Sequence, residues 1–153
     1  MDNIKKSKEQ EFKELLEILP DFCVTFFKAT RDRYQITTKV AYALDLKVFF
    51  QYLITAKHSK FPYESIKFIT LEEIAALNAV DIQDYLEYLE YYEIDGKIFT
   101  NKNQGKKRKL MSLKALYKYF GSIGKIDRSP TEFVYSPTIH KKEIKTLSEN
   151  EKN

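Results

Sequence analysis

Apolar side chains recur at a spacing of three and four residues along almost the whole chain, which is the spacing of an α-helix. The segment from Thr37 to about Lys57 shows one such stripe, formed by Tyr42, Leu46, Phe49, Phe50 and Leu53. Only four Gly and four Pro occur among 153 residues, so few positions interrupt regular elements. We find neither a convincing strand pattern nor an internal repeat. The sequence therefore predicts an all-α fold, a compact bundle of orthogonally packed helices.

Further helical segments have recognisable starts and stops. They are an amphipathic stretch with Phe12, Leu15, Leu16 and Leu19; a helix opened by Pro20 and Asp21; a short helix after the capping box Thr70–Glu73; the stretch Asp81–Tyr92; and Asn103–Phe120, which ends before Gly121 and Gly124. Thr37 or Thr38 is expected to cap the long helix. We expect one domain at residues 20–134, after a helical extension at residues 1–19 and before an extended linker at residues 135–153.

Cysteine and hydropathy patterns indicate a cytoplasmic protein. Cys23 is the only cysteine, which excludes an internal disulfide and suits a reducing compartment. No apolar run approaches the roughly 18 residues of a membrane span, and the amino terminus lacks the apolar centre of a signal peptide. His58 and His140 are interpreted as surface residues, and no metal-ligand spacing or phosphate-binding loop occurs. We expect no cofactor and no metal.

Charges separate along the chain. Every charged residue from Glu72 to Asp95 is acidic, whereas every charged residue from Lys97 to Lys125 is basic, although the net charge is only +4. One explanation is an acidic helix packed beside a basic one with salt bridges between them. The alternative is that each segment turns its charges outward, because its apolar stripe must face the core.

The basic segment 103–120 has two distinct faces when it is drawn at 100° per residue. Its core face comprises Leu110, Leu113, Leu116, Tyr117 and Phe120. The opposite face comprises Lys107, Arg108, Met111, Ser112, Lys114, Ala115 and Lys118. Such a face fits the major groove of DNA, where lysine and arginine reach phosphates on either side. A lysine-rich helix face that is merely solvated is the alternative, and RNA would accept the same charges.

The long helix from Thr37 carries apolar residues opposite its core stripe. That side comprises Val40, Ala41, Leu44, Lys47, Val48 and Gln51. Either a neighbouring helix covers this side, or it meets a partner, with aliphatic groups available for thymine methyl groups.

Several motifs occur in an order that is familiar from one protein family. The stretch Thr38-x3-Tyr42-x2-Asp45-Leu46-x2-Phe49-x2-Tyr52-Leu53 is similar to the T-x3-Y-x2-D-L-x2-F-x2-F/Y-L signature of the core-binding domain of the tyrosine recombinases, the phage integrase family. Asp81-Ile82-x2-Tyr85-Leu86-x2-Leu89 and residues 107–120 resemble its next two helices. Ser129-Pro130-Thr131-Glu132-x-Val134 resembles its N-P-x-x-x-V exit, and Leu147-Ser148-x-x-Glu151 resembles the start of the family's catalytic domain. The matches follow the family order, although Ser129, Lys114 and Met111 depart from the usual residues.

The resemblance implies a bundle of four or five helices that forms one half of a C-shaped clamp around double-stranded DNA. It places the DNA-contacting residues on two helices, namely Thr37, Thr38, Ala41, Leu44, Lys47, Lys106, Lys107, Arg108, Met111, Ser112, Lys114 and Lys118. It also implies other recombinase protomers as partners, in a tetramer on DNA, and a monomeric state for this chain alone.

Catalysis is not expected from this chain. The family's arginine, histidine and tyrosine chemistry belongs to a domain that would follow it, and Tyr42, Tyr85 and Tyr117 stand at core spacing. We expect the chain to bind DNA and not to cut it. A stand-alone helical DNA-binding regulator and a helical protein-interaction module are the alternatives.

Overall fold

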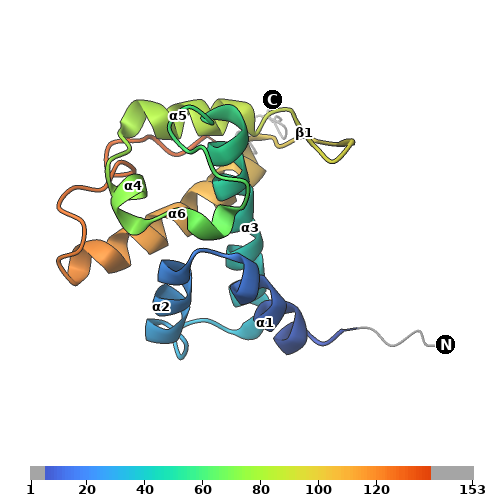
Figure 1. Ribbon diagram of the computed structural model, residues 1–153, viewed down its shortest axis with the longest axis vertical. Helices are drawn as coiled ribbons and strands as arrows, with labels where there is room; N and C mark the ends of the chain where they lie inside the picture. The colour runs from blue at the N-terminus through green and yellow to red at the C-terminus, as the bar shows by residue number, and fades with distance from the viewer. Residues whose placement is uncertain (1–5, 139–153) are drawn as a thin grey trace, which may run out of the picture.

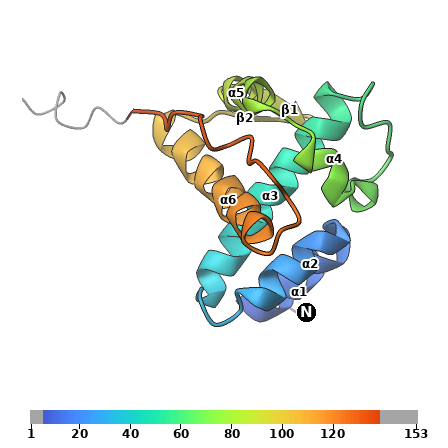
Figure 2. The same cartoon turned by 90° about the vertical axis from the view of Figure 1, so that its left-hand side faces the viewer.

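The long helix α3 (Ile36–Ala56) runs through the middle of the computed structural model, which describes residues 6–138 (Figures 1 and 2). Near one end of α3 lie α1 (Lys8–Ile18) and α2 (Asp21–Ala29), and near the other lie α4 (Leu71–Ala75) and α5 (Ala79–Tyr88). The last helix, α6 (Asn103–Ser122), crosses α3 and contacts both α3 and α2. A short 3-10 helix, η1 (Ile66–Phe68), packs on α3. The predicted all-α bundle is confirmed.

Side-chain caps explain where several helices begin. Ser7 accepts a hydrogen bond from the backbone N–H of Gln10 at the start of α1. Reciprocal capping boxes open α4 and α5, the first at Thr70 as the sequence predicts and the second at Asn78. The predicted cap of α3 is wrong: Gln35 is the N-cap, so Thr37 and Thr38 lie within the first turn. Their backbone N–H groups therefore belong to the unsatisfied donors of a helix start.

A β-hairpin follows α5, where the sequence analysis predicted a helix to Tyr92 and no strand. The helix expected to continue to Tyr92 ends at Tyr88, and strands β1 (Tyr92–Ile94) and β2 (Lys97–Phe99) pair in antiparallel register. Asp95 and Gly96 connect them with positive φ angles of 52° and 80°. Two positive φ angles at Asp-Gly match the turn whose twist suits a two-residue hairpin. The hairpin extends away from the helices (Figure 1).

The core is rich in aromatic rings contributed by α2, α3, α5 and α6. The largest side chains with almost no exposed surface include Phe26, Phe49, Phe50, Tyr85 and Tyr117. Phe49 and Tyr85 meet edge to face with ring centroids 5.0 Å apart, which is a favourable aromatic geometry. Tyr85 and Tyr117 are therefore core residues, as predicted. Tyr42 differs from that prediction, because it is only partly buried.

The segment that follows α6 folds back along the bundle. Ile126, Thr131 and Val134 are buried, and the chain returns toward the start of α6, where the Asn103 side-chain amide donates to the Thr138 carbonyl at 2.8 Å (Figure 2). We call residues 126–138 the return segment. His140 and the motif Leu147–Glu151 lie outside the described residues.

Two buried tyrosines should respond differently to removal of their hydroxyl groups. Tyr117 donates to the Ile74 carbonyl at 2.7 Å, whereas Tyr85 Oη has no partner within residues 6–138. We expect Tyr117→Phe to lower the free energy of unfolding by about 1 kcal/mol, and Tyr85→Phe to leave it unchanged or raise it by about 1 kcal/mol. Urea denaturation at neutral pH measures both. A comparable loss in the two variants would contradict the difference in hydrogen bonding.

The same burial predicts a loss of stability in alkali. Burial raises the pKa of the Cys23 thiol above its ordinary 9.0, raises that of Tyr52 to about 12, and raises those of Tyr85 and Tyr117 above their ordinary 10.0. The unfolded chain then releases these protons first, so the contribution of these four groups to the free energy of unfolding is constant below about pH 9 and falls as pH rises further. Urea titrations from pH 8 to pH 11 would measure this fall, which should be shallower for Tyr85→Phe.

Candidate nucleic-acid interface

An ionic network locks α6 against α3. Arg108 donates to both carboxylate oxygens of Asp45, from Nε at 3.2 Å and from an Nη at 2.8 Å. The Asp45 side chain is 2% exposed, while that of Arg108 remains 57% exposed. The guanidinium is therefore fixed on its inner edge and open on its outer edge. This two-bond geometry specifies orientation more strongly than a single contact.

Lys109 extends the network into the protein. Its Nζ lies 3.7 Å from Asp45 and donates to the Asn101 side-chain carbonyl at 3.2 Å, and Asn101 in turn donates to the Leu89 carbonyl at 3.0 Å. Burial lowers the pKa of Lys109 from its ordinary value, and the Asp45 carboxylate opposes that shift. The network thus connects α3, α6 and the end of α5. Sequence reasoning missed this role. The signal was Asp45 itself, a carboxylate next to Leu46 on the core side of the predicted helix.

Three lysines project from the exposed face of α6. Lys107 and Lys118 are exposed, Lys114 is partly exposed, and Met111 lies among them with 50% of its surface accessible. Among residues 6–138, no carboxylate lies within ion-pair distance of any of these three lysines. The first turn of α6 carries no acid either. This face, defined as Lys107, Met111, Lys114 and Lys118, is the α6 cationic face.

Other predicted contact residues of α6 are placed elsewhere. Ser112 is fully buried and donates to the Lys109 carbonyl at 2.7 Å, so its placement on the outer face is wrong. The reason is that the buried side of α6 extends about 40° beyond Leu116, the edge of the apolar stripe, and so includes Ser112. Lys106 pairs with Glu90 at 2.7 Å, and its side chain is only 12% exposed.

The Lys106–Glu90 pair also bears on the separation of charge along the chain. Among the described residues, it is the ion pair that joins the acidic segment 72–95 to the basic segment 97–125. Mutual neutralisation of two neighbouring helices therefore explains little of the pattern, and most of these charges face solvent.

The residues predicted on α3 divide between two sides of that helix. Thr37 and Leu44 are exposed, and Thr38 and Ala41 are partly exposed. Asp45 faces α6, and Ala41 lies about 40° from it around the helix axis, whereas Lys47 lies about 200° away. Helical geometry thus separates Lys47 from the α6 cationic face. Val40, whose outer position was noted in the sequence, is 2% exposed, so neighbouring packing covers it.

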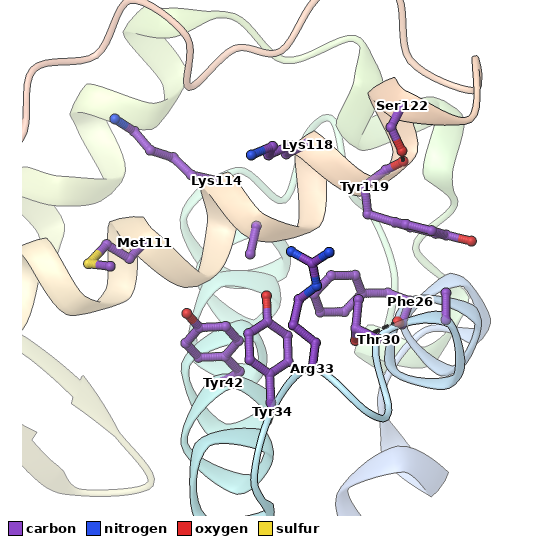
Figure 3. Close-up of a pocket in the computed structure, with 12 residues that line it drawn as sticks. Phe26, Thr30, Arg33, Tyr34, Tyr42, Met111, Lys114, Lys118, Tyr119 and Ser122 are labelled. Carbon is purple, nitrogen blue, oxygen red and sulfur yellow. Dashed lines mark hydrogen bonds between the residues drawn. The ribbon is translucent and has the colours of Figure 1, made fainter.

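A hollow of about 650 Å³ opens between α6 and the connection from α2 to α3 (Figure 3). The rings of Tyr34 and Tyr42 stand side by side beneath α6 with their hydroxyl groups toward it, and their centroids are 5.1 Å apart. Arg33 reaches up from the connection, and Lys114 and Lys118 line the α6 side with their amino groups turned outward. Sequence reasoning missed Arg33 and Tyr34, which lie in a loop without periodicity.

No protein-family model, curated protein or solved structure matches this chain. The candidate interface is therefore described from the residues and geometry of this chain alone. Within residues 6–138, no cluster of histidine, cysteine and acidic side chains is arranged to hold a metal ion. None of the helices in that range is both long and apolar enough to cross a membrane.

Proposed function

We propose that this chain is the DNA-binding core-binding domain of a tyrosine recombinase, which grips half of a recombination site through the major groove. The observation that carries the proposal is the α6 cationic face, whose lysines have no acidic partner among the described residues. An α-helix fits the major groove, and cations along its exposed side reach phosphates on both groove walls. The order of the sequence motifs supports the family assignment.

The start of α3 supplies the second part of the proposed surface. Thr37 and Thr38 lie in a first turn that has no side-chain cap and no acid, so their N–H groups suit a DNA phosphate. Ala41 and Leu44 add small and aliphatic contacts beside it. Arg108 is assigned to fixing α6 on α3, with its outer edge available to DNA. Lys47, Lys106 and Ser112 are left out of the proposed contact surface.

The proposed role is binding without strand cleavage. In a full recombinase acting in the cytoplasm, a catalytic domain would exchange strands while this bundle holds the site as half of a C-shaped clamp. Other recombinase protomers would complete the complex. The hairpin offers a surface for such protein contacts, because Tyr91 and Ile98 are 63% and 58% exposed. A helical protein-interaction module remains the second candidate function on the strength of that apolar surface.

Fluorescence anisotropy of a labelled random-sequence duplex across a salt series tests the proposal, with single-stranded RNA as the comparison. We expect the logarithm of affinity to fall linearly with the logarithm of salt concentration, with a slope near −0.9 for each phosphate contacted. Affinity for the duplex should exceed that for RNA. Absence of duplex binding at low salt, together with self-association that salt weakens, would favour the protein-interaction module.

A further inference from the structure

The hollow beside the α6 cationic face has the chemistry of a nucleotide site. Three cations, Arg33, Lys114 and Lys118, lie around it, and no carboxylate is among the residues that line it. Aromatic rings form much of its wall, contributed by Phe26, Tyr34, Tyr42 and Tyr119. Its volume of about 650 Å³ lies within the range of small-ligand sites. Cations at the rim and aromatic rings within match the phosphate and the base of one nucleotide.

We propose that this hollow receives an unpaired nucleotide of the bound DNA, its base against Tyr34 and Tyr42 and its phosphates on Lys114, Lys118 and Arg33. The inference rests on the proposed function and deepens it. A base within an intact duplex is stacked on both faces and exposes only its edge in a groove. Only a base that has left the stack presents a face to an aromatic ring. The hollow therefore favours DNA with an unpaired position over continuous duplex.

The positions of the side chains in Figure 3 fit this division of labour. The Tyr34 and Tyr42 rings lie inside the hollow, whereas the amino groups of Lys114 and Lys118 point outward, where a sugar-phosphate backbone would pass. Tyr42 is partly buried, and this burial raises the pKa of its hydroxyl above its ordinary 10.0, further from physiological pH. Lys114 and Lys118 belong to both the cationic face and the rim. A DNA strand that follows the face thus leads to the hollow.

The test compares one labelled duplex with the same duplex carrying a single unpaired thymidine in its middle. Stacking of one base on an aromatic side chain predicts that the bulged duplex binds about tenfold more tightly. Arg33→Gln and Tyr34→Leu should each abolish most of that preference while leaving affinity for the intact duplex within about twofold. The matched control is Arg31→Gln, which removes an exposed arginine of the same loop that does not line the hollow. It should retain the full preference.

Each outcome separates this inference from the proposed function. Tight binding to both duplexes with equal affinity, or a preference that survives Arg33→Gln and Tyr34→Leu, overturns the nucleotide site and leaves DNA binding intact. Binding of single-stranded DNA without duplex binding supports the hollow and overturns the duplex clamp. Absence of binding to all three DNA probes overturns both. Displacement of the bulged duplex by poly-glutamate as effectively as by single-stranded DNA would overturn the nucleotide site and identify an acidic peptide as the occupant.

Discussion

Replacing Asp45 with alanine should lower the free energy of unfolding by about 3–5 kcal/mol. The Asp45 carboxylate is almost fully buried between Arg108 and Lys109. Without it, the Lys109 ammonium would remain inside the protein, 8% exposed, with only the Asn101 carbonyl as a partner. An uncompensated buried charge is costly because it has lost water and gained no counterion. Urea denaturation followed by far-ultraviolet circular dichroism gives the free energy.

Two variants make this expectation specific. Asp84→Ala removes an aspartate that is 48% exposed and pairs with Lys57 at 3.4 Å, and it should cost less than about 1 kcal/mol. The double change Asp45→Leu with Lys109→Met replaces the buried charges by apolar groups and should recover most of the loss. If Asp45→Ala costs no more than Asp84→Ala, the network does not hold α6 on α3.

Reversing three charges on the α6 cationic face should have the largest effect on DNA binding. The triple variant Lys107→Glu, Lys114→Glu and Lys118→Glu should reduce affinity for duplex DNA at least about 100-fold at low salt. It should also make the salt slope shallower by about one for each phosphate that the variant no longer binds. The side chains are at least partly exposed and lack acidic partners among the described residues, so the fold should persist. Anisotropy measures affinity, and circular dichroism checks helicity.

The control carries the same change in net charge at another place. Lys8, Lys13 and Lys60 are exposed and lie outside α3 and α6, so their reversal to glutamate isolates the effect of total charge. This control should lose far less affinity than the α6 variant and keep most of the salt slope. Equal losses of affinity in the two triple variants would show that DNA binding depends on overall charge. They would contradict the placement of α6 in the major groove.

The helices were predictable because their signals are local, whereas the hairpin was not recognised. Apolar spacing identified α1, α3 and α6, although α6 continues through Gly121 to Ser122, and the capping box at Thr70 identified α4. The residues before Asp95 continue the apolar spacing of α5, so periodicity alone extended that helix to Tyr92. The decisive signal was the Asp-Gly pair between two short alternating stretches, because two positive φ angles favour a tight hairpin. Tyr92 then stacks on Phe99 across the hairpin, with ring centroids 5.1 Å apart.

The candidate site was predictable only where one helix decides the placement. A helical wheel correctly placed Lys107, Met111, Lys114 and Lys118 on the outside of α6. It was wrong for Ser112, because burial depends on neighbours that approach from a second direction. The partner of Arg108 lies 63 positions away in the sequence, so no local pattern identifies the pair. The hollow likewise joins a loop to α6, and only the fold brings Arg33 near Lys118.

The return segment determines how the bundle would bear a mechanical load at its carboxyl side. Because residues 126–138 run back beside α6, the chain leaves the described structure near the start of that helix and not near its end (Figure 2). Tension applied beyond Thr138 would first break its bond to Asn103 and then peel Val134, Thr131 and Ile126 from their buried positions in turn. The return segment would therefore unfold first and lengthen the chain under load, while α3 and α6 remain packed.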